Sequence, residues 1–215
     1  TYPASDYSSI SVVDISEANM ESTYGRRLLL ASAFFPLAGM NSQGLAVSTY
    51  SVDQHRASQS LDKPDIIWSV AIRLMLDKAA TVPEALALLD SYDMLIDEGN
   101  SLQMLIADAT GDSAVAAWVN GAMRITRRSG SWQAVSNFVQ WEAEESAYTS
   151  CARYTSAKEF LISHPETMDE DVGFMLLKTT AQTPHTQFSV VCNLTEREMV
   201  LAFGSKFEER HRFDQ

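Results

Sequence analysis

Three apolar, strand-like runs in the middle of the chain follow one another through turns that are too short to hold a helix. The runs cover residues 102–108, 113–120 and 122–126. The first join is Ala-Thr-Gly-Asp at 109–112, and the second is the Asn120-Gly121 pair that hairpin turns favour. Parallel neighbours need a crossover of a dozen or more residues, so these short turns can only join antiparallel strands. The sequence therefore excludes a purely parallel sheet with alternating helices and predicts an antiparallel sheet.

Two pairs of helices interrupt the strands. In the first pair, apolar residues recur at helical spacing over 65–79. Thr81 then begins a second helix, in which Glu84 completes a capping box and Pro83 is tolerated in the first turn. The second pair is expected at 150–163 and 169–180. A short link makes each pair antiparallel, and such a layer must cover a sheet.

Further strand-like runs precede and follow the helix pairs. They are expected at 9–15, 28–31, directly after a turn at 39–44, at 132–138, 187–193 and 199–203, and near Arg212. This order predicts an α+β fold, a four-layer αββα sandwich of two antiparallel sheets, in a single domain spanning 1–215. The residues expected to be buried in it are Trp68, Val70, Leu74, Leu86, Leu89, Leu105, Val115 and Val190.

The charge balance excludes one class of function. The net charge is −12, whereas a nucleic-acid-binding surface needs clustered Lys and Arg, and the pairs Arg26-Arg27 and Arg127-Arg128 are short. No run approaches the roughly 18 uninterrupted apolar residues that a membrane helix requires. We therefore expect a soluble protein, cytoplasmic or periplasmic, with no nucleic-acid partner and no membrane partner. A homo-oligomer is compatible with this composition.

Four segments share a pattern with a known superfamily. They are Gly-Met-Asn-Ser-Gln-Gly-Leu at 39–45, Ile-Ala-Asp-Ala-Thr-Gly-Asp-Ser at 106–113, Val-Ser-Asn-Phe at 135–138 and Cys-Ala-Arg-Tyr at 151–154. In order and rough spacing they resemble motifs of the choloylglycine hydrolase and penicillin V acylase superfamily, in the branch near acyl-coenzyme A:isopenicillin acyltransferases. The resemblance covers nearly the whole chain. It implies the αββα fold of N-terminal-nucleophile hydrolases and the hydrolysis of, or acyl transfer from, a linear amide C–N bond.

The resemblance also implies a nucleophile that the start of this chain does not show. Members of that superfamily use an N-terminal Cys, whose thiolate attacks and whose own α-amine acts as base. This sequence begins with Thr1, and Pro3 removes a backbone donor where a nucleophile-bearing strand should be regular. The early strand with Arg-x-x-Asp is not found either, since no acidic residue lies three positions after Arg26. We expect the nucleophile segment and the first strands to lie outside residues 1–215.

Two positions match the superfamily's catalytic shell. Asn137 matches an Asn whose carboxamide helps to bind the oxyanion, and Arg153 matches an Arg that favours the thiolate and orients carboxylates. Both residue types also have structural uses, at a strand end or early in a helix. Three more residues are expected beside the substrate: Asn41, whose amide also suits pinning its own turn, and Tyr50 and Ser51, where a related enzyme carries an oxyanion donor. Neither Tyr50 nor Ser51 is the Asn of the bile-salt branch, so bile-salt specificity is not implied.

The cysteines and histidines support neither a disulfide framework nor a metal site. Cys151 precedes a helix, whose dipole can lower a thiol pKa, and Cys192 lies in a strand as a small apolar residue. The four His residues are scattered without ligand spacing. Asp108 and Asp112 flank a turn that is expected to bond its own backbone. No metal and no cofactor are expected.

These observations leave two functions open. The first is a cysteine-type amide hydrolase or acyltransferase that acts on a small N-acyl substrate, such as a penicillin, an N-acyl amino acid or an acyl-homoserine lactone. The second is a catalytically inactive protein of the same fold, or a fragment of one, that serves as a binding or structural subunit. The missing N-terminal Cys favours the second for this polypeptide, whereas a Cys upstream of Thr1 would favour the first.

Overall fold

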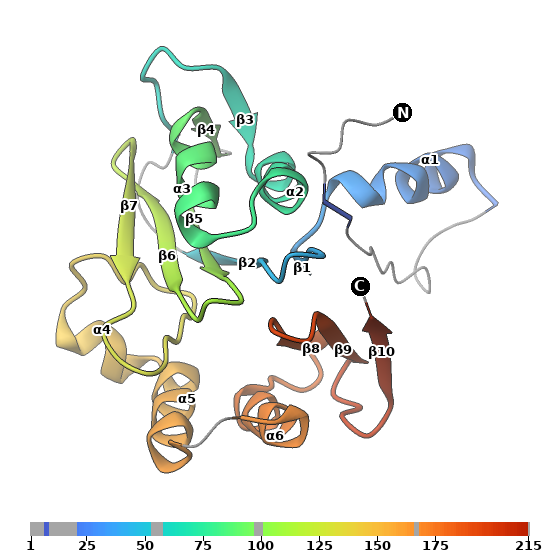
Figure 1. Cartoon of the computed structure of the whole chain (residues 1–215), viewed down its shortest axis with the longest axis vertical. Coiled ribbons are helices and arrows are strands. Elements are labelled where there is room, and N and C mark those ends of the chain that lie inside the picture. Colours follow the sequence, from blue (N-terminus) through green and yellow to red (C-terminus); the bar gives the residue numbers. More distant parts are fainter. Residues whose placement is uncertain (1–6, 9–20, 53–57, 97–100, 166–167, 215) are drawn as a thin grey trace.

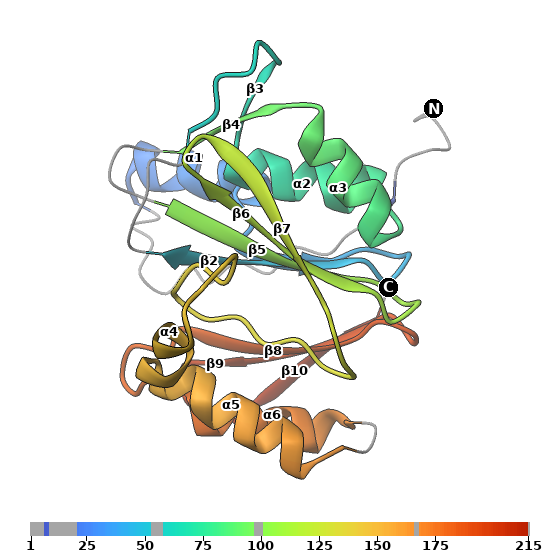
Figure 2. The same ribbon diagram turned by 90° about the vertical axis from the view of Figure 1, so that its left-hand side faces the viewer.

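The fold consists of four layers. The computed structural model describes residues 7–8, 21–52, 58–96, 101–165 and 168–214. Figure 2 shows the layers edge-on: a helical layer, the larger sheet, the smaller sheet and a second helical layer. The larger sheet has five strands and the smaller one has three. The predicted αββα arrangement of two antiparallel sheets is confirmed.

The larger sheet carries both predicted hairpins. It consists of β1 (Ala38–Met40), β2 (Ala46–Val52), β5 (Ser101–Ala107), β6 (Ser113–Val119) and β7 (Ala122–Arg127), in the order β1-β2-β5-β6-β7. All neighbours are antiparallel. Asn120 and Gly121 have φ of 52° and 74°, which is the backbone that a two-residue hairpin turn of this kind requires.

The first helix pair covers one face of this sheet (Figure 1). It comprises α2 (Trp68–Lys78), which packs on β1 and β2, and α3 (Val82–Asp90), which packs on β5 and β6. As predicted, the Thr81 hydroxyl accepts a hydrogen bond from the backbone N–H of Glu84, and Pro83 lies in the first turn. The expected helix at 65–79 begins later, because β3 (Asp65–Ile67) pairs in parallel with β4 (Asp93–Leu95).

The second sheet and its helices form the other two layers. The strands β8 (Phe188–Asn193), β9 (Glu198–Phe203) and β10 (Arg210–Asp214) lie in the order β10-β9-β8. Before them come α4 (Glu145–Ser150), α5 (Ala152–Ser163) and α6 (Glu170–Thr180). Asp169 caps α6 by accepting from Val172 N at 2.9 Å. α6 packs on β8, and α5 lies beside α6.

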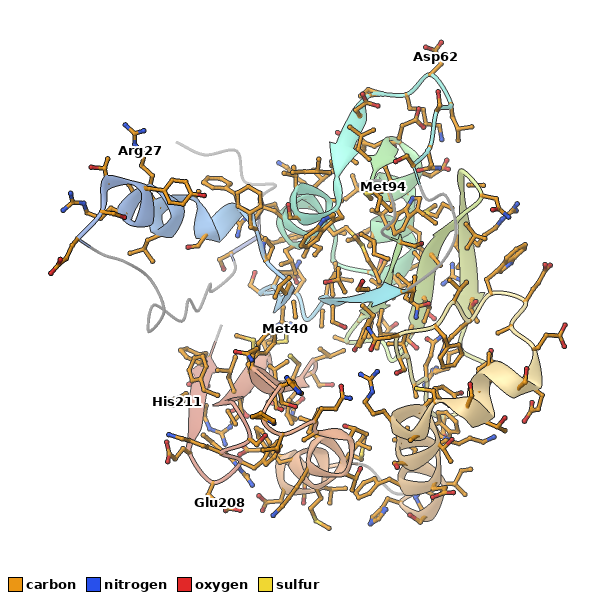
Figure 3. All side chains as sticks on the ribbon, turned by 180° about the vertical axis from the view of Figure 1, so that it is seen from behind. Arg27, Met40, Asp62, Met94, Glu208 and His211 are labelled. Atoms are coloured by element: carbon orange, nitrogen blue, oxygen red, sulfur yellow. The ribbon has the colours of Figure 1, made fainter. Side chains whose placement is uncertain are left out.

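One predicted strand is a helix. Residues 28–31 belong to α1 (Thr23–Ala31), which continues into the short 3-10 helix η1 (Ser32–Phe34), so the prediction of a strand there is wrong. Ser22 starts α1 by accepting from Gly25 N at 2.8 Å, and Arg, Leu and Ala are among the strongest helix formers. In Figure 3, Arg27 of α1 projects away from the body, whereas Met40 lies in the interior. The strand predicted at 9–15 falls outside the described residues.

A second predicted strand is also wrong: the described segment 132–138 has no strand structure. Glutamine side chains, rather than a neighbouring strand, bind several of its backbone carbonyls. Gln140 Nε2 donates to Ala134 O, and Gln103 Nε2 donates to both Ser136 O and Phe138 O. These side-chain contacts replace the ladder that a strand would form.

The predicted core is confirmed in part. Leu86, Leu89 and Val115 are buried, and Trp68 and Leu74 pack partly buried against the main cluster. Leu105 and Val190 are half-buried. Val70 is 41% exposed, so its predicted burial is wrong: it lies about 200° around α2 from Ile72, which is completely buried. Within the described residues, every helix falls short of the length and apolar character needed to cross a membrane.

Candidate active site

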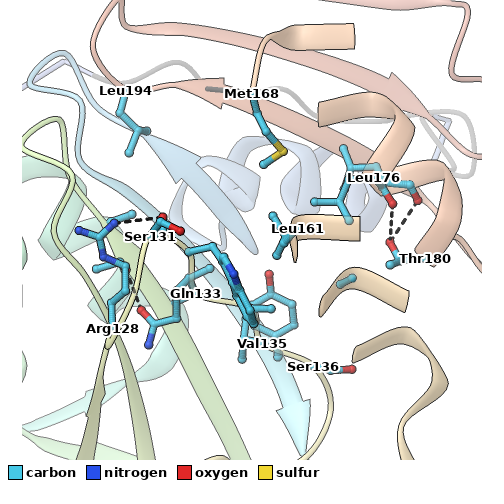
Figure 4. A pocket seen from close by; sticks show the side chains of 18 of the residues that line it. Arg128, Ser131, Gln133, Val135, Ser136, Leu161, Met168, Leu176, Thr180 and Leu194 are labelled. Carbon is cyan, nitrogen blue, oxygen red and sulfur yellow. Dashed lines mark hydrogen bonds between the residues drawn. The ribbon is translucent and has the colours of Figure 1, made fainter. Parts of the chain in front are cut away.

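A cavity of about 630 Å³ opens between the larger sheet and the second helix pair. Its apolar walls come from Leu105 on β5, Leu161 on α5, and Leu176 and Leu177 on α6. A polar side is formed by the segment that follows β7. Figure 4 shows Arg128, Ser131 and Gln133 of that segment across the cavity from Leu161, Leu176 and Thr180. The cavity therefore offers an apolar chamber with a polar margin, as small-molecule sites commonly do.

Asn137 lines this cavity from the irregular segment between β7 and α4. Its Nδ2 donates to the backbone carbonyl of Ser51 at 2.6 Å, although the two residues are 86 positions apart. This contact attaches the segment to β2. A carboxamide NH2 has two hydrogens, so one N–H remains for a further acceptor.

Arg153 lines the same cavity from the first turn of α5. Among the described residues, no carboxylate forms an ion pair with its guanidinium. A guanidinium that has no ion-paired carboxylate in the described part of the chain suits an anionic or polarised group in the cavity.

Cys151 occupies the N-cap position of α5, and its Sγ lies 3.2 Å from the hydroxyl oxygen of Ser136. Partial burial raises the pKa of this thiol. The hydrogen bonds to Ser136 and to the Tyr154 backbone, together with the charge of Arg153, outweigh that effect and lower the pKa overall. The start of α5 is thus electropositive toward the segment that carries Asn137.

Tyr50 and Ser51 contribute to the site in different ways. Tyr50 lines the cavity; burial raises the pKa of its phenol, which accepts a hydrogen bond from the Ser48 hydroxyl. Ser51 is absent from the cavity lining, and it contributes the backbone carbonyl that holds Asn137.

Asn41 lies away from the cavity and is completely buried. Its Nδ2 donates to Leu76 O and Ala79 O, at 2.9 and 2.7 Å, and its Oδ1 accepts from Gln43 N and Leu45 N, both at 3.0 Å. Both N–H groups of the carboxamide therefore donate to backbone carbonyls, and its oxygen accepts from two backbone N–H groups. The residue ties the turn before β2 to the C-terminal end of α2.

Sequence reasoning missed two parts of this site. From the sequence, the helices at α5 and α6 are expected only to cover a sheet. An apolar stripe on a helix looks the same in the sequence whether it lines a cavity or packs in a core, so the apolar wall of the cavity is not predicted. Gln103 was also missed, since a single polar residue in an otherwise apolar strand carries no motif. Its completely buried carboxamide bonds the backbone on both sides of Asn137.

A protein-family model and solved structures both match this chain. A family model described as acyl-coenzyme A:6-aminopenicillanic acid acyl-transferase matches residues 29–190. No sequence among the curated proteins gives a significant match.

Solved structures with the same layers include two bacterial enzymes. One is the penicillin V acylase from Agrobacterium tumefaciens, with a TM-score of 0.64 and 18% identity, over 80% of this chain and 63% of that one. Another is a variant of the conjugated bile acid hydrolase from Clostridium perfringens, with a TM-score of 0.62 and 12% identity, over 83% of this chain and 72% of that one. The match thus spans less than two thirds of the acylase. At these identities the likeness concerns the fold.

Proposed function

The chain belongs to the acyl-coenzyme A:6-aminopenicillanic acid acyl-transferase family, and from that premise we propose that it serves amide hydrolysis or acyl transfer at the linear C–N bond of a small N-acyl compound. The fold, that of the N-terminal-nucleophile hydrolases, is consistent with this activity but does not select it, because one fold hosts many functions.

One observation carries the proposal. Tyr50, Asn137 and Arg153 come from three separate parts of the chain and line a single cavity of about 630 Å³. The cavity combines an apolar chamber for an acyl group with a carboxamide donor and a cation. These are the groups that acyl transfer requires around a developing oxyanion.

In the proposed reaction, a cysteine thiolate attacks the amide carbonyl and the free N–H of Asn137 donates to the oxyanion. The α-amine of that cysteine has taken the thiol proton and is then an ammonium group. The C–N bond breaks, and the leaving amine takes this proton from the ammonium group, which restores the free α-amine. The acyl group remains on sulfur as a thioester until water or an acceptor amine cleaves it. Arg153 would favour the thiolate or hold a carboxylate of the substrate. As proposed, the cysteine is an N-terminal residue outside residues 1–215.

The N-terminus of the native protein tests this proposal. Intact mass and N-terminal sequencing of protein purified from its source should find a mature chain that begins with Cys upstream of Thr1. That protein should release the acyl group from penicillin V or from chromogenic N-acyl amino acids. A native chain that begins at Thr1 and leaves all these amides intact would contradict the proposal, and would support an inactive protein of this fold that serves as a binding subunit.

A further inference from the structure

Gln103 is a polar residue in the middle of an apolar strand. It lies on β5 directly opposite Tyr50 of β2, and its side chain is completely buried. Residues at even spacing along a strand share a face, so Gln103 points to the same side of the sheet as Leu105, which lines the cavity. Burying a carboxamide is unfavourable unless its hydrogen-bonding groups are used, so the contacts of Gln103 should reveal its purpose.

Those contacts converge on one residue. Gln103 Nε2 donates to Ser136 O at 2.6 Å and to Phe138 O at 2.7 Å. The two acceptors are the backbone carbonyls immediately before and after Asn137. The segment has no strand ladder in the described structure, so side-chain bonds attach it to the sheet, and around Asn137 these are the bonds from Gln103 and the bond of Asn137 to Ser51 O.

We propose that Gln103 is a positioning residue: its buried carboxamide fixes the backbone on both sides of Asn137, and thereby aims the Asn137 carboxamide into the cavity. This inference rests on the proposed function, in which Asn137 donates to the oxyanion. Asn137 is then held at two points on adjacent strands, by its own bond to Ser51 on β2 and by Gln103 on β5.

The chemistry of the position requires a donor with two N–H groups. Gln103 Oε1 is buried and has no hydrogen-bond partner among the described residues, so the side chain is used for donation alone. Rotating the amide by 180° would place its oxygen against two carbonyl oxygens. A Glu carboxylate of the same shape meets the same repulsion, and Met offers no donor.

The fixed segment also reaches α5. The hydroxyl oxygen of Ser136 lies 3.2 Å from the sulfur of Cys151, at the start of the helix that carries Arg153. Moving Ser136 would therefore change the surroundings of the Cys151 thiol. We call the two hydrogen bonds from Gln103 to the carbonyls of Ser136 and Phe138 the Gln103 clamp. The reactivity of the Cys151 thiol can therefore show whether the clamp is intact in residues 1–215, without any catalytic assay.

A measurement on the unaltered protein tests the clamp directly. By NMR, the side-chain N–H groups of Gln103 should exchange with solvent at least about 100-fold more slowly than those of Gln43, which is exposed. Through-bond couplings should join Gln103 Nε2 to the carbonyl carbons of residues 136 and 138. Exchange as fast as that of Gln43, with no coupling, would overturn the proposal.

Variants test the consequence for Asn137. Gln103→Met and Gln103→Glu should shift the Asn137 side-chain amide resonance toward that of a carboxamide that has lost its hydrogen bond to Ser51 O, and should move the pH midpoint of Cys151 alkylation upward. Cys192 is a slow internal reference, because burial raises its pKa to about 11. The matched control is Gln140→Met. Gln140 is also buried and bonds a carbonyl of the same segment, Ala134 O, but it does not flank Asn137. The inference fails if the control reproduces both effects, or if neither Gln103 variant changes them.

Activity separates this inference from the proposed function. In a nucleophile-bearing form of the protein, Gln103→Met should lower kcat by about 10-fold or more and leave KM nearly unchanged, because a misaimed oxyanion donor weakens transition-state binding. An altered Asn137 resonance in a protein that never shows amidase activity would uphold the clamp and reject the proposed reaction. An unaltered kcat in an active enzyme would reject the positioning role alone.

Discussion

At the scale of single residues, Asn137 carries the chemistry of the proposed site. Its side chain lines the cavity, and one of its N–H groups is held by Ser51 O. In a nucleophile-bearing form of the protein, Asn137→Ala should lower kcat by about 10²-fold, because an oxyanion donor is lost. Steady-state kinetics on penicillin V or an N-acyl amino acid would measure this.

Asn193→Ala is the matched control for that change. Asn193 is exposed, lies outside the lining of the cavity, and accepts a local hydrogen bond from Glu196 N. The Asn193→Ala variant should leave kcat unchanged. Full activity in Asn137→Ala would remove Asn137 from the mechanism, whereas equal losses in both variants would indicate a general effect on folding.

At the scale of elements, Asp108 joins the β5–β6 hairpin to the start of α3. Its carboxylate accepts from Val82 N at 2.8 Å and from Thr110 N at 2.9 Å, and the residue is 2% exposed. Burial raises the pKa of this carboxyl, but the hydrogen bonds from Thr110, Val82 and Asp112 outweigh burial and lower it overall. The predicted self-bonded turn is confirmed, and its carboxylate also satisfies an N–H at a helix N-terminus.

Asp108→Asn should therefore lower the free energy of unfolding by about 1–3 kcal/mol at pH 7. A folded-state pKa below the unfolded value of 3.8 stabilises the protein above that pH, and this contribution is lost as the pH falls through the folded pKa. The difference between the two proteins in urea denaturation should thus shrink below about pH 4.

Asp112→Asn is the control in the same hairpin. The Asp112 carboxylate pairs with Arg127 at 3.1 Å, and both side chains are substantially exposed. Loss of such a surface pair should cost less than about 1 kcal/mol. A constant difference between wild type and Asp108→Asn from pH 7 to pH 3 would contradict the assigned role of the Asp108 charge.

At the scale of the whole molecule, Gly44 permits the two sheets to approach each other. Its φ is +78°, and a Cβ on it would lie 2.2 Å from the backbone oxygen of Leu194, in the turn between β8 and β9. Gly44→Ala should destabilise the fold by about 2–4 kcal/mol, from left-handed backbone strain together with a clash between backbones. Thermal or chemical denaturation would measure this.

Gly111→Ala isolates the strain from the clash. Gly111 has φ of +87°, but no atom of the described residues lies within 4 Å of the position that a Cβ would take. Its replacement should cost only about 1–2 kcal/mol. Equal losses at the two glycines would show that the contact with Leu194 contributes nothing to holding the layers together.

Local features of the sequence determined much of the fold. The Asn120-Gly121 turn and the Thr81 and Asp169 caps act over a few residues, so their geometry can be read from neighbouring positions. The same holds for the turn at Asn41, although its bonds to Leu76 and Ala79 depend on α2. The resemblance to the family made Asn137 and Arg153 candidates for the site, but it says nothing of how their side chains are held.

Tertiary structure alone decided the rest. Residues 28–31 are apolar enough for a strand, but a strand needs a partner, and no described strand pairs with them. Residues 132–138 resemble a strand, yet the side chain of Gln103, more than 30 positions away, takes up two of their carbonyls. The cavity likewise requires α5, α6 and β5 to meet. Such contacts depend on which distant segments pack together, and burial makes them strong because water cannot compete for the buried hydrogen-bonding groups.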